Sequence, residues 1–357
     1  TSICISIILG LILSLLGIFA SPSLLIMMKT PKVVLKSSIL YLQIYCGGLI
    51  FNVIYNMATG ILNAAGNSKK PLVYLAIASF TNIILDLLFI KIFKLGVMGA
   101  AIATDISQAI SCILAIGYLL KVKSDYKLYI KDLKINKETA VKIIKIGLPT
   151  AIQNMVISFS NVLVQSSVNA YGATAMAGYA AYLKIDGFNI LPVLSISMAV
   201  TTFTGQNVGA NRLDRVKKGM YSSLIMVLVY TVFIGAVLLI FSHQVLGLFT
   251  HSAQVIMYGQ LAMKYFCPYY FLLGILNVLA GTVRGAGKGI PPMIILLFSM
   301  CIFRILWIKI ALPFYSSIDG VFILYPISWL VGAILMIFYT KFGKWLPHKQ
   351  MEKKENS

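Results

Sequence analysis

The sequence predicts an all-α membrane protein built from two pseudo-symmetric helical lobes. Of its 357 residues, 59% are hydrophobic and 11% are charged, and the mean hydropathy is +0.90. Such a composition is typical of chains that cross a bilayer several times. Ten apolar segments are long enough to cross about 30 Å of hydrocarbon, and an internal repeat relates the two halves of the chain.

The ten expected spans follow one another with short polar connections between them. We expect them at 3–28, 37–65, 71–93, 97–120, 143–170, 176–205, 217–247, 253–282, 290–315 and 318–343. The first four form an amino-terminal lobe and the last six a carboxy-terminal lobe. The resulting domains are the lobe 1–120, a cytoplasmic linker 121–142, the lobe 143–343 and a cytoplasmic tail 344–357.

The basic residues predict how the chain is oriented. If the first span begins in the cytoplasm, the connections on that side hold 21 basic residues and the opposite connections hold six. Because cytoplasmic loops carry an excess of Lys and Arg, both ends of a multi-pass protein of the cell membrane are expected in the cytoplasm. The basic residues lie between apolar runs and not on one face with interleaved aromatics, so nucleic acid is not an expected partner.

The internal repeat predicts a transporter architecture. A shift of 221 residues aligns 21–118 with 242–339 without a gap, with 23 of 98 positions identical. Matches such as Gly60 with Gly281 report backbone shape and not mere hydrophobicity. Doubling of this kind is typical of secondary transporters. The spans within 143–205 have no counterpart in the chain, so the first lobe is expected to be a six-helix repeat truncated to four, with two more spans before Thr1.

One carboxylate, Asp86, lies inside the apolar run TNIILDLLFI. A charge at this depth is costly and usually functional. Asn82 lies one helical turn earlier on the same face, and Thr104 lies on the next, antiparallel span. Their oxygen atoms suit a small cation or a proton. The alternative is a structural role in which Asp86 only bonds its neighbours. The offset of the repeat aligns Asn82 with Phe303 and Asp86 with Trp307, so the polar pair occurs in one lobe only. This asymmetry favours a functional role.

Five short motifs resemble the multidrug and toxic-compound extrusion (MATE) family of efflux antiporters. They are GNSKKP at 66–71, NIILDLLFI at 82–90, GVMGAAIAT at 96–104, KIGLP at 145–149 and GQNVGA at 205–210. The ten spans resemble the twelve-span design of this family with the first two removed. The resemblance implies a cation or proton site formed by Asn82, Asp86 and Thr104 together with an aspartate of the first span, which is expected before Thr1.

The resemblance also implies the function. We expect a multidrug efflux antiporter that exports lipophilic or cationic compounds in exchange for sodium ions or protons, by alternating access between the lobes. No cofactor and no metal are expected beyond the coupling ion, which would be a proton or a sodium ion at Asp86. Drug-like small molecules and the bilayer are the expected partners of a monomer. Side chains that could line a substrate cavity are Gln153, Asn154, Asn161, Asp186 and Tyr269.

The sequence leaves three alternatives to an antiporter. A lipid-linked oligosaccharide flippase of the same superfamily should have several arginines in its cavity, whereas Arg304 is the one arginine inside an expected span. An intramembrane enzyme is disfavoured because His243, His251 and His348 lie at connections or in the tail, with no nucleophile or metal-ligand partner nearby. A non-transporting truncated remnant is the third alternative.

Overall fold

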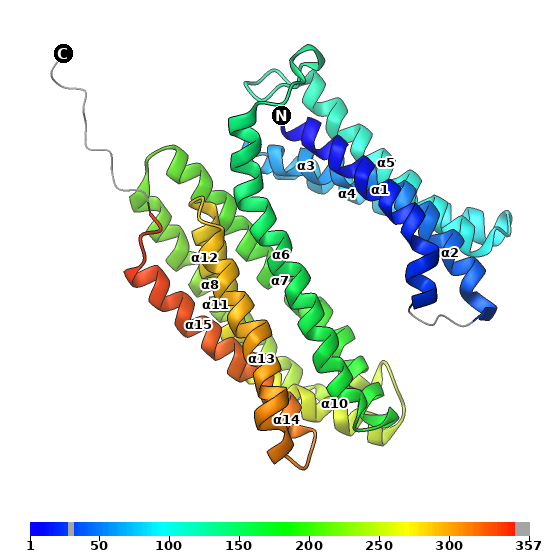
Figure 1. Cartoon of the computed structure of the whole chain (residues 1–357), viewed down its shortest axis with the longest axis vertical. Helices are drawn as coiled ribbons and strands as arrows, with labels where there is room; N and C mark the ends of the chain where they lie inside the picture. The colour runs from blue at the N-terminus through cyan, green and yellow to red at the C-terminus, as the bar shows by residue number, and fades with distance from the viewer. Residues whose placement is uncertain (28–31, 347–357) are drawn as a thin grey trace. The chain divides into compact units, whose positions relative to one another are not determined.

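The computed structural model describes residues 1–27 and 32–346, and all regular secondary structure in these residues is helical. Ten helical segments within the described ranges are long and apolar enough to cross a membrane, which confirms the predicted fold class. The chain divides into two compact units, residues 1–143 and 144–357 (Figure 1). Of the predicted tail 344–357, residues 347–357 lie outside the described residues.

The first unit contains four membrane-length helical segments. α1 packs against α2 and α3, and α5 packs against α2, α3 and α4. The elements are α1 (Ser2–Met27), α2 (Lys32–Gly47), α3 (Leu49–Ala64), α4 (Lys69–Leu87), the π-helical turn η1 (Leu88–Ile92), α5 (Gly96–Lys121) and the short 3₁₀ turn η2 (Ile130–Asp132).

The second unit contains six membrane-length segments, several of them interrupted. Its elements are α6 (Lys137–Asn169), α7 (Ala173–Gly209), α8 (Leu213–Ile240), α9 (Ser242–Gly247), α10 (Ala253–Phe266), η3 (Cys267–Tyr269), α11 (Tyr270–Gly285), α12 (Ile290–Leu297), η4 (Phe298–Ile302), α13 (Phe303–Leu306), η5 (Trp307–Ala311), η6 (Leu312–Phe314), α14 (Asp319–Phe322) and α15 (Leu324–Phe342). α6 begins at Lys137, before the boundary between the two units, so the last part of the predicted linker 121–142 is already helical.

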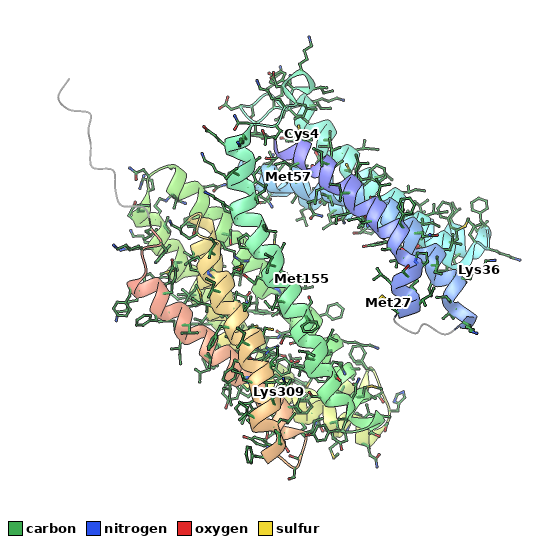
Figure 2. The ribbon with its side chains drawn as sticks, in the orientation of Figure 1. Cys4, Met27, Lys36, Met57, Met155 and Lys309 are labelled. Carbon is green, nitrogen blue, oxygen red and sulfur yellow. The ribbon has the colours of Figure 1, made fainter. Side chains whose placement is uncertain are left out.

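Helix α1 buries mainly small residues and exposes large apolar ones. In α1, Leu16 and Phe19 are exposed, as are Met27 of α1 and Met155 of α6 (Figure 2). The buried residues of α1 are Ile3, Ser6, Gly10, Ser14 and Ser21. Membrane helices pack in this way because lipid is as apolar as the side chains, so no hydrophobic effect drives these side chains into the protein. Small residues at the helix contacts let the backbones approach closely.

The repeat is visible in the backbone. α3 and α11 begin 221 residues apart and also end 221 residues apart. Each is followed by a glycine in the left-handed region, Gly66 at φ +80° and Gly287 at φ +84°. The amide N–H of Gly66 donates to the carbonyl of Asn63 at 3.0 Å, and that of Gly287 donates to the carbonyl of Arg284 at 2.9 Å. Glycine adopts this conformation without steric cost, so both copies end a helix with the same turn.

Candidate functional site

The predicted cation residues lie on two neighbouring helices of the first unit. Asn82 and Asp86 lie on α4, one helical turn apart, and Thr104 lies on α5, which packs against α4. Asp86 is in the last turn of α4, directly before the π-helical turn η1. π-helical turns occur frequently at functional sites.

A pocket of about 670 Å³ opens between α3, α4 and α5, and Asn82 and Thr104 both line it. Asp86 is not among its lining residues, and lies one turn further along α4 than Asn82. Within the described part of the chain, the lining has amides and hydroxyls but no charged side chain. Its polar residues are Asn52, Tyr55, Asn56, Thr59, Asn63, Ser68, Ser79, Asn82, Thr104, Ser107, Gln108 and Ser111.

Several polar atoms around this pocket are buried without a hydrogen-bond partner among the described residues. They are Thr59 Oγ1, Asn82 Nδ2, Asp86 Oδ1 and Gln108 Oε1. Leaving a buried polar atom unpaired costs about 1–3 kcal/mol, so folded proteins rarely cluster such atoms. The cluster marks the α3–α4–α5 region as a place where a small polar ligand or an ion would be stabilised.

The chemistry of the donor set fits a small hard cation. The hydroxyl of Thr104 donates to the carbonyl of Ala100 at 2.9 Å, which fixes the side chain and leaves the oxygen lone pairs available. Asn82 contributes an amide and Asp86 a carboxylate, and Na⁺ and other hard cations prefer such oxygen ligands. The same carboxylate can bind a proton.

The side chain of Asp105, which follows Thr104 in the sequence, points away from the pocket. It packs against Gly48 at the junction of α2 and α3, where a Cβ on residue 48 would overlap its carboxylate. Asp105 is also absent from the pocket lining. Asp105 and Asp86 therefore have different surroundings, although both are acidic residues of the first unit.

Sequence reasoning missed the contribution of α3. Asn52, Asn56, Thr59 and Asn63 all line the pocket, and the side-chain amide of Asn56 donates to the backbone and side-chain oxygens of Asn52, both at 2.9 Å. These four residues recur at i, i+4, i+7 and i+11, the spacing of one helix face. That periodicity was the available signal.

The predicted substrate-cavity residues of the second unit have diverse surroundings. Gln153 is buried, whereas Asn154 and Tyr269 are exposed. Asn161 accepts a hydrogen bond from Arg304 at 3.0 Å, and Asp186 accepts one from Tyr270 at 2.8 Å. None of the five lines the pocket described above, or a second pocket of about 510 Å³ between α7 and α8. Their role in substrate binding stays a prediction.

A repeated bundle of apolar helices with a carboxylate in one of its spans is typical of secondary membrane transporters. A family model described as MatE matches residues 1–88 and 149–308. The chain belongs to this family.

Curated relatives match most of the chain. A probable multidrug resistance protein of Bacillus subtilis (strain 168), YoeA, is 30% identical over an alignment of 359 residues. The alignment covers 96% of this chain and 76% of that protein. YpnP of the same strain, also a probable multidrug resistance protein, is 29% identical over 338 residues, or 95% and 75% of the two chains.

Solved structures show the same fold. The outward-facing conformation of a multidrug resistance MATE family transporter of the MOP superfamily superposes with a TM-score of 0.89 at 23% identity, over 95% of this chain and 76% of that chain. A MATE structure in the bent conformation gives a TM-score of 0.86 at 21% identity, over 96% of this chain and 75% of that one. The family and the fold therefore agree with the resemblance found in the sequence.

Proposed function

We propose that this protein is an antiporter that exports lipophilic or cationic drug-like compounds in exchange for a proton or a sodium ion bound at Asp86. The observation that carries the proposal is the buried, unpartnered Oδ1 of Asp86 one turn from Asn82. Membership of the MatE family and relatives named as multidrug resistance proteins support it.

The chemistry of coupling follows from the cost of a charge in the membrane. An ionised aspartate costs about 2.5–3.5 kcal/mol at the centre of a helix in lipid, which is an upper bound for Asp86 in the last turn of α4. A bound proton or sodium ion removes most of this cost, and the oxygens of Asn82 and Thr104 would complete the shell of a sodium ion. Binding of the cation then favours one conformation of the transporter and binding of the substrate favours the other, which is how exchange is coupled.

The same proposal covers location and assembly. We infer a monomer in the cell membrane with both ends in the cytoplasm, supported by the distribution of basic residues along the sequence. The flippase alternative gains no support from Arg304, because its guanidinium is buried and hydrogen-bonded to Asn161 and Ser328.

The test is efflux of a fluorescent lipophilic cation from vesicles that contain the purified protein, driven by a proton gradient or by a sodium gradient. We expect Asp86→Asn to reduce coupled efflux at least tenfold, because it removes the charge with little change in volume. Asp214→Asn is the matched control, because Asp214 is exposed and paired with Arg212 at 3.4 Å. Efflux of the Asp86→Asn protein at the wild-type rate would refute the proposal.

A further inference from the structure

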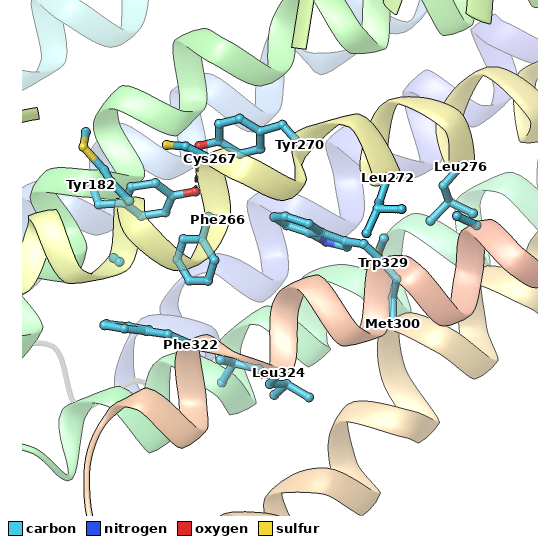
Figure 3. Packing of buried hydrophobic residues seen from close by; sticks show 14 of the residues in the cluster. Tyr182, Phe266, Cys267, Tyr270, Leu272, Leu276, Met300, Phe322, Leu324 and Trp329 are labelled. Carbon is cyan, nitrogen blue, oxygen red and sulfur yellow. Dashed lines mark hydrogen bonds between the residues drawn. The ribbon is translucent and has the colours of Figure 1, made fainter. Parts of the chain in front are cut away.

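The second unit contains a buried polar cluster that the proposed cation site does not use. At one end, the hydroxyl of Tyr270 on α11 donates to Oδ1 of Asp186 on α7 at 2.8 Å. The hydroxyls of Tyr270 and Tyr182 are 3.0 Å apart, and Figure 3 shows this contact among the rings of Phe266, Phe322 and Trp329. Asp186 itself is partly exposed.

At the other end lies Arg304 of α13, which is only 2% exposed. Its Nε donates to the hydroxyl of Ser328 at 3.1 Å and its Nη1 donates to Oδ1 of Asn161 at 3.0 Å. Its guanidinium carbon lies 4.5 Å from the ring centroid of Tyr325. Among the described residues, no carboxylate forms an ion pair with Arg304.

Two tyrosines connect the ends of the cluster. The hydroxyls of Tyr325 and Tyr179 are 2.6 Å apart, and the ring of Tyr179 stacks on that of Tyr182 with centroids 6.0 Å apart. Tyr182 and Asp186 lie one turn apart on α7. The carboxylate and the guanidinium are therefore the two charged ends of one aromatic, hydroxyl-rich cluster.

The repeat places part of this cluster at positions that line the pocket in the first unit. With the offset of 221, Ile83, Thr104, Ser107 and Gln108 of the pocket correspond to Arg304, Tyr325, Ser328 and Trp329. The second unit thus places a permanent positive charge and two aromatic rings where the first unit has a pocket. The carboxylate at the edge of this cluster, Asp186, can bind a proton.

We propose that Asp186 is a second protonation site of the transporter, which binds a proton and loses it again during the transport cycle. This inference rests on the proposed function. The proton passes from water to a carboxylate oxygen of Asp186 and later returns to water. The hydroxyl of Tyr270 stabilises the ionised form by donating to it, and it can turn to accept from the neutral carboxyl group.

The ionisable groups around Asp186 come from several helices. Tyr182 lies on α7 itself, Tyr270 on α11 and Cys267 on η3. Further from Asp186, towards the other end of the cluster, lie Tyr325 on α15 and Arg304 on α13. From α8, the hydroxyl of Tyr230 donates to the carbonyl oxygen of Asn189, one turn after Asp186. Arg304 is the single permanent charge among these groups.

The first experiment detects the proton directly by infrared difference spectroscopy of the purified protein between acidic and alkaline pH. We expect a carboxylic-acid C=O band that Asp186→Asn removes and that Asp86→Asn and the control Asp214→Asn keep. Tyr270→Phe retains the carboxylate but deletes its hydrogen-bond donor, so it should move this band to higher wavenumber. It also serves as the second variant if Asp186→Asn fails to fold.

The sodium dependence of that band tests whether the ion that binds Asp186 is a proton. The Asp186 band should be the same with and without sodium, and a band that sodium suppresses would overturn the proposal. The proposal is also overturned if no band depends on Asp186 and Tyr270→Phe leaves the spectrum unchanged.

The second experiment relates the proton to transport. We expect the number of protons released per exported dye molecule to fall by about one in Asp186→Asn, and an unchanged number would show that Asp186 takes no part in the cycle. If the wild type exports no dye under either gradient but the Asp186 band is present, the proposed function fails and the protonation site stands.

Discussion

Gly281 and Gly60 occupy equivalent positions of the repeat but have different surroundings. A Cβ on Gly281 of α11 would lie 2.6 Å from the carbonyl oxygen of Ser197 and 2.9 Å from the hydroxyl oxygen of Thr201, both on α7. A Cβ on Gly60 of α3 would have no atom of the described residues within 4 Å, apart from its own helix and neighbours. We therefore predict that alanine destabilises the protein at position 281 and stabilises it at position 60.

The magnitudes follow from three contributions. Alanine is favoured over glycine in a helix interior by about 1 kcal/mol at either position. Overpacking costs about 1–3 kcal/mol, and it applies to position 281 alone. The same methyl strains the hydrogen bond from Thr201 to the carbonyl of Gly281, 3.0 Å long, which is worth about 0.5–1.5 kcal/mol. The net expectation is a loss of about 0.5–3.5 kcal/mol for Gly281→Ala and a gain of up to about 1 kcal/mol for Gly60→Ala.

Thermal melting of both variants in the same detergent tests this prediction. For units of this size, 1 kcal/mol moves the melting temperature by about 2–4 °C, so the two variants should separate by several degrees on opposite sides of the wild type. The reasoning is refuted if both variants shift in the same direction by similar amounts. It is also refuted if alanine at position 281 leaves the melting temperature unchanged.

Three further predictions use the same protein preparations or intact cells. Single cysteines placed in 121–145 and 205–218 should escape an impermeant thiol reagent in intact cells, because the excess of basic residues predicts that both connections are cytoplasmic; labelling of 121–145 would refute this topology. Gly66→Ala and Gly287→Ala should each cost about 1–2 kcal/mol, because both glycines have positive φ, and an unchanged melting temperature in either variant would contradict this. Arg304→Lys should lower the melting temperature despite keeping the charge, because an ammonium cannot reproduce the planar fork that bonds two side chains and stacks on a ring; an equal melting temperature would show that only charge matters.

The fold could be predicted from the sequence because its signals are local. Each span is a continuous apolar run, and the repeat carries its turn glycines, such as Gly66 and Gly287, at a constant offset. The candidate site was partly predictable for the same reason, since Asn82 and Asp86 share one helix face and Thr104 lies on the next span.

What could not be predicted depends on contacts between distant helices. Nothing in the sequence near Asp186 indicates that Tyr270, 84 positions later, donates to it. Lys184 lies two positions before Asp186 in the sequence, yet its ammonium lies over the ring of Phe249, 5.6 Å from the centroid. Arg304 is the one arginine inside an expected span, but its partners Asn161 and Ser328 come from two other helices. Such partners become visible only once the helices are packed.

The central claim is that Asp86 binds the cation that is exchanged for substrate. The most direct measurement is the release of bound cation when a lipophilic cationic dye is added to the purified protein, followed as acidification of an unbuffered solution without sodium and as loss of bound radioactive sodium in its presence. We predict dye-induced release of one of these ions from the wild type and from Asp214→Asn. We also predict that Asp86→Asn binds the dye but releases at least one cation fewer. Equal release from Asp86→Asn and the wild type would contradict the claim.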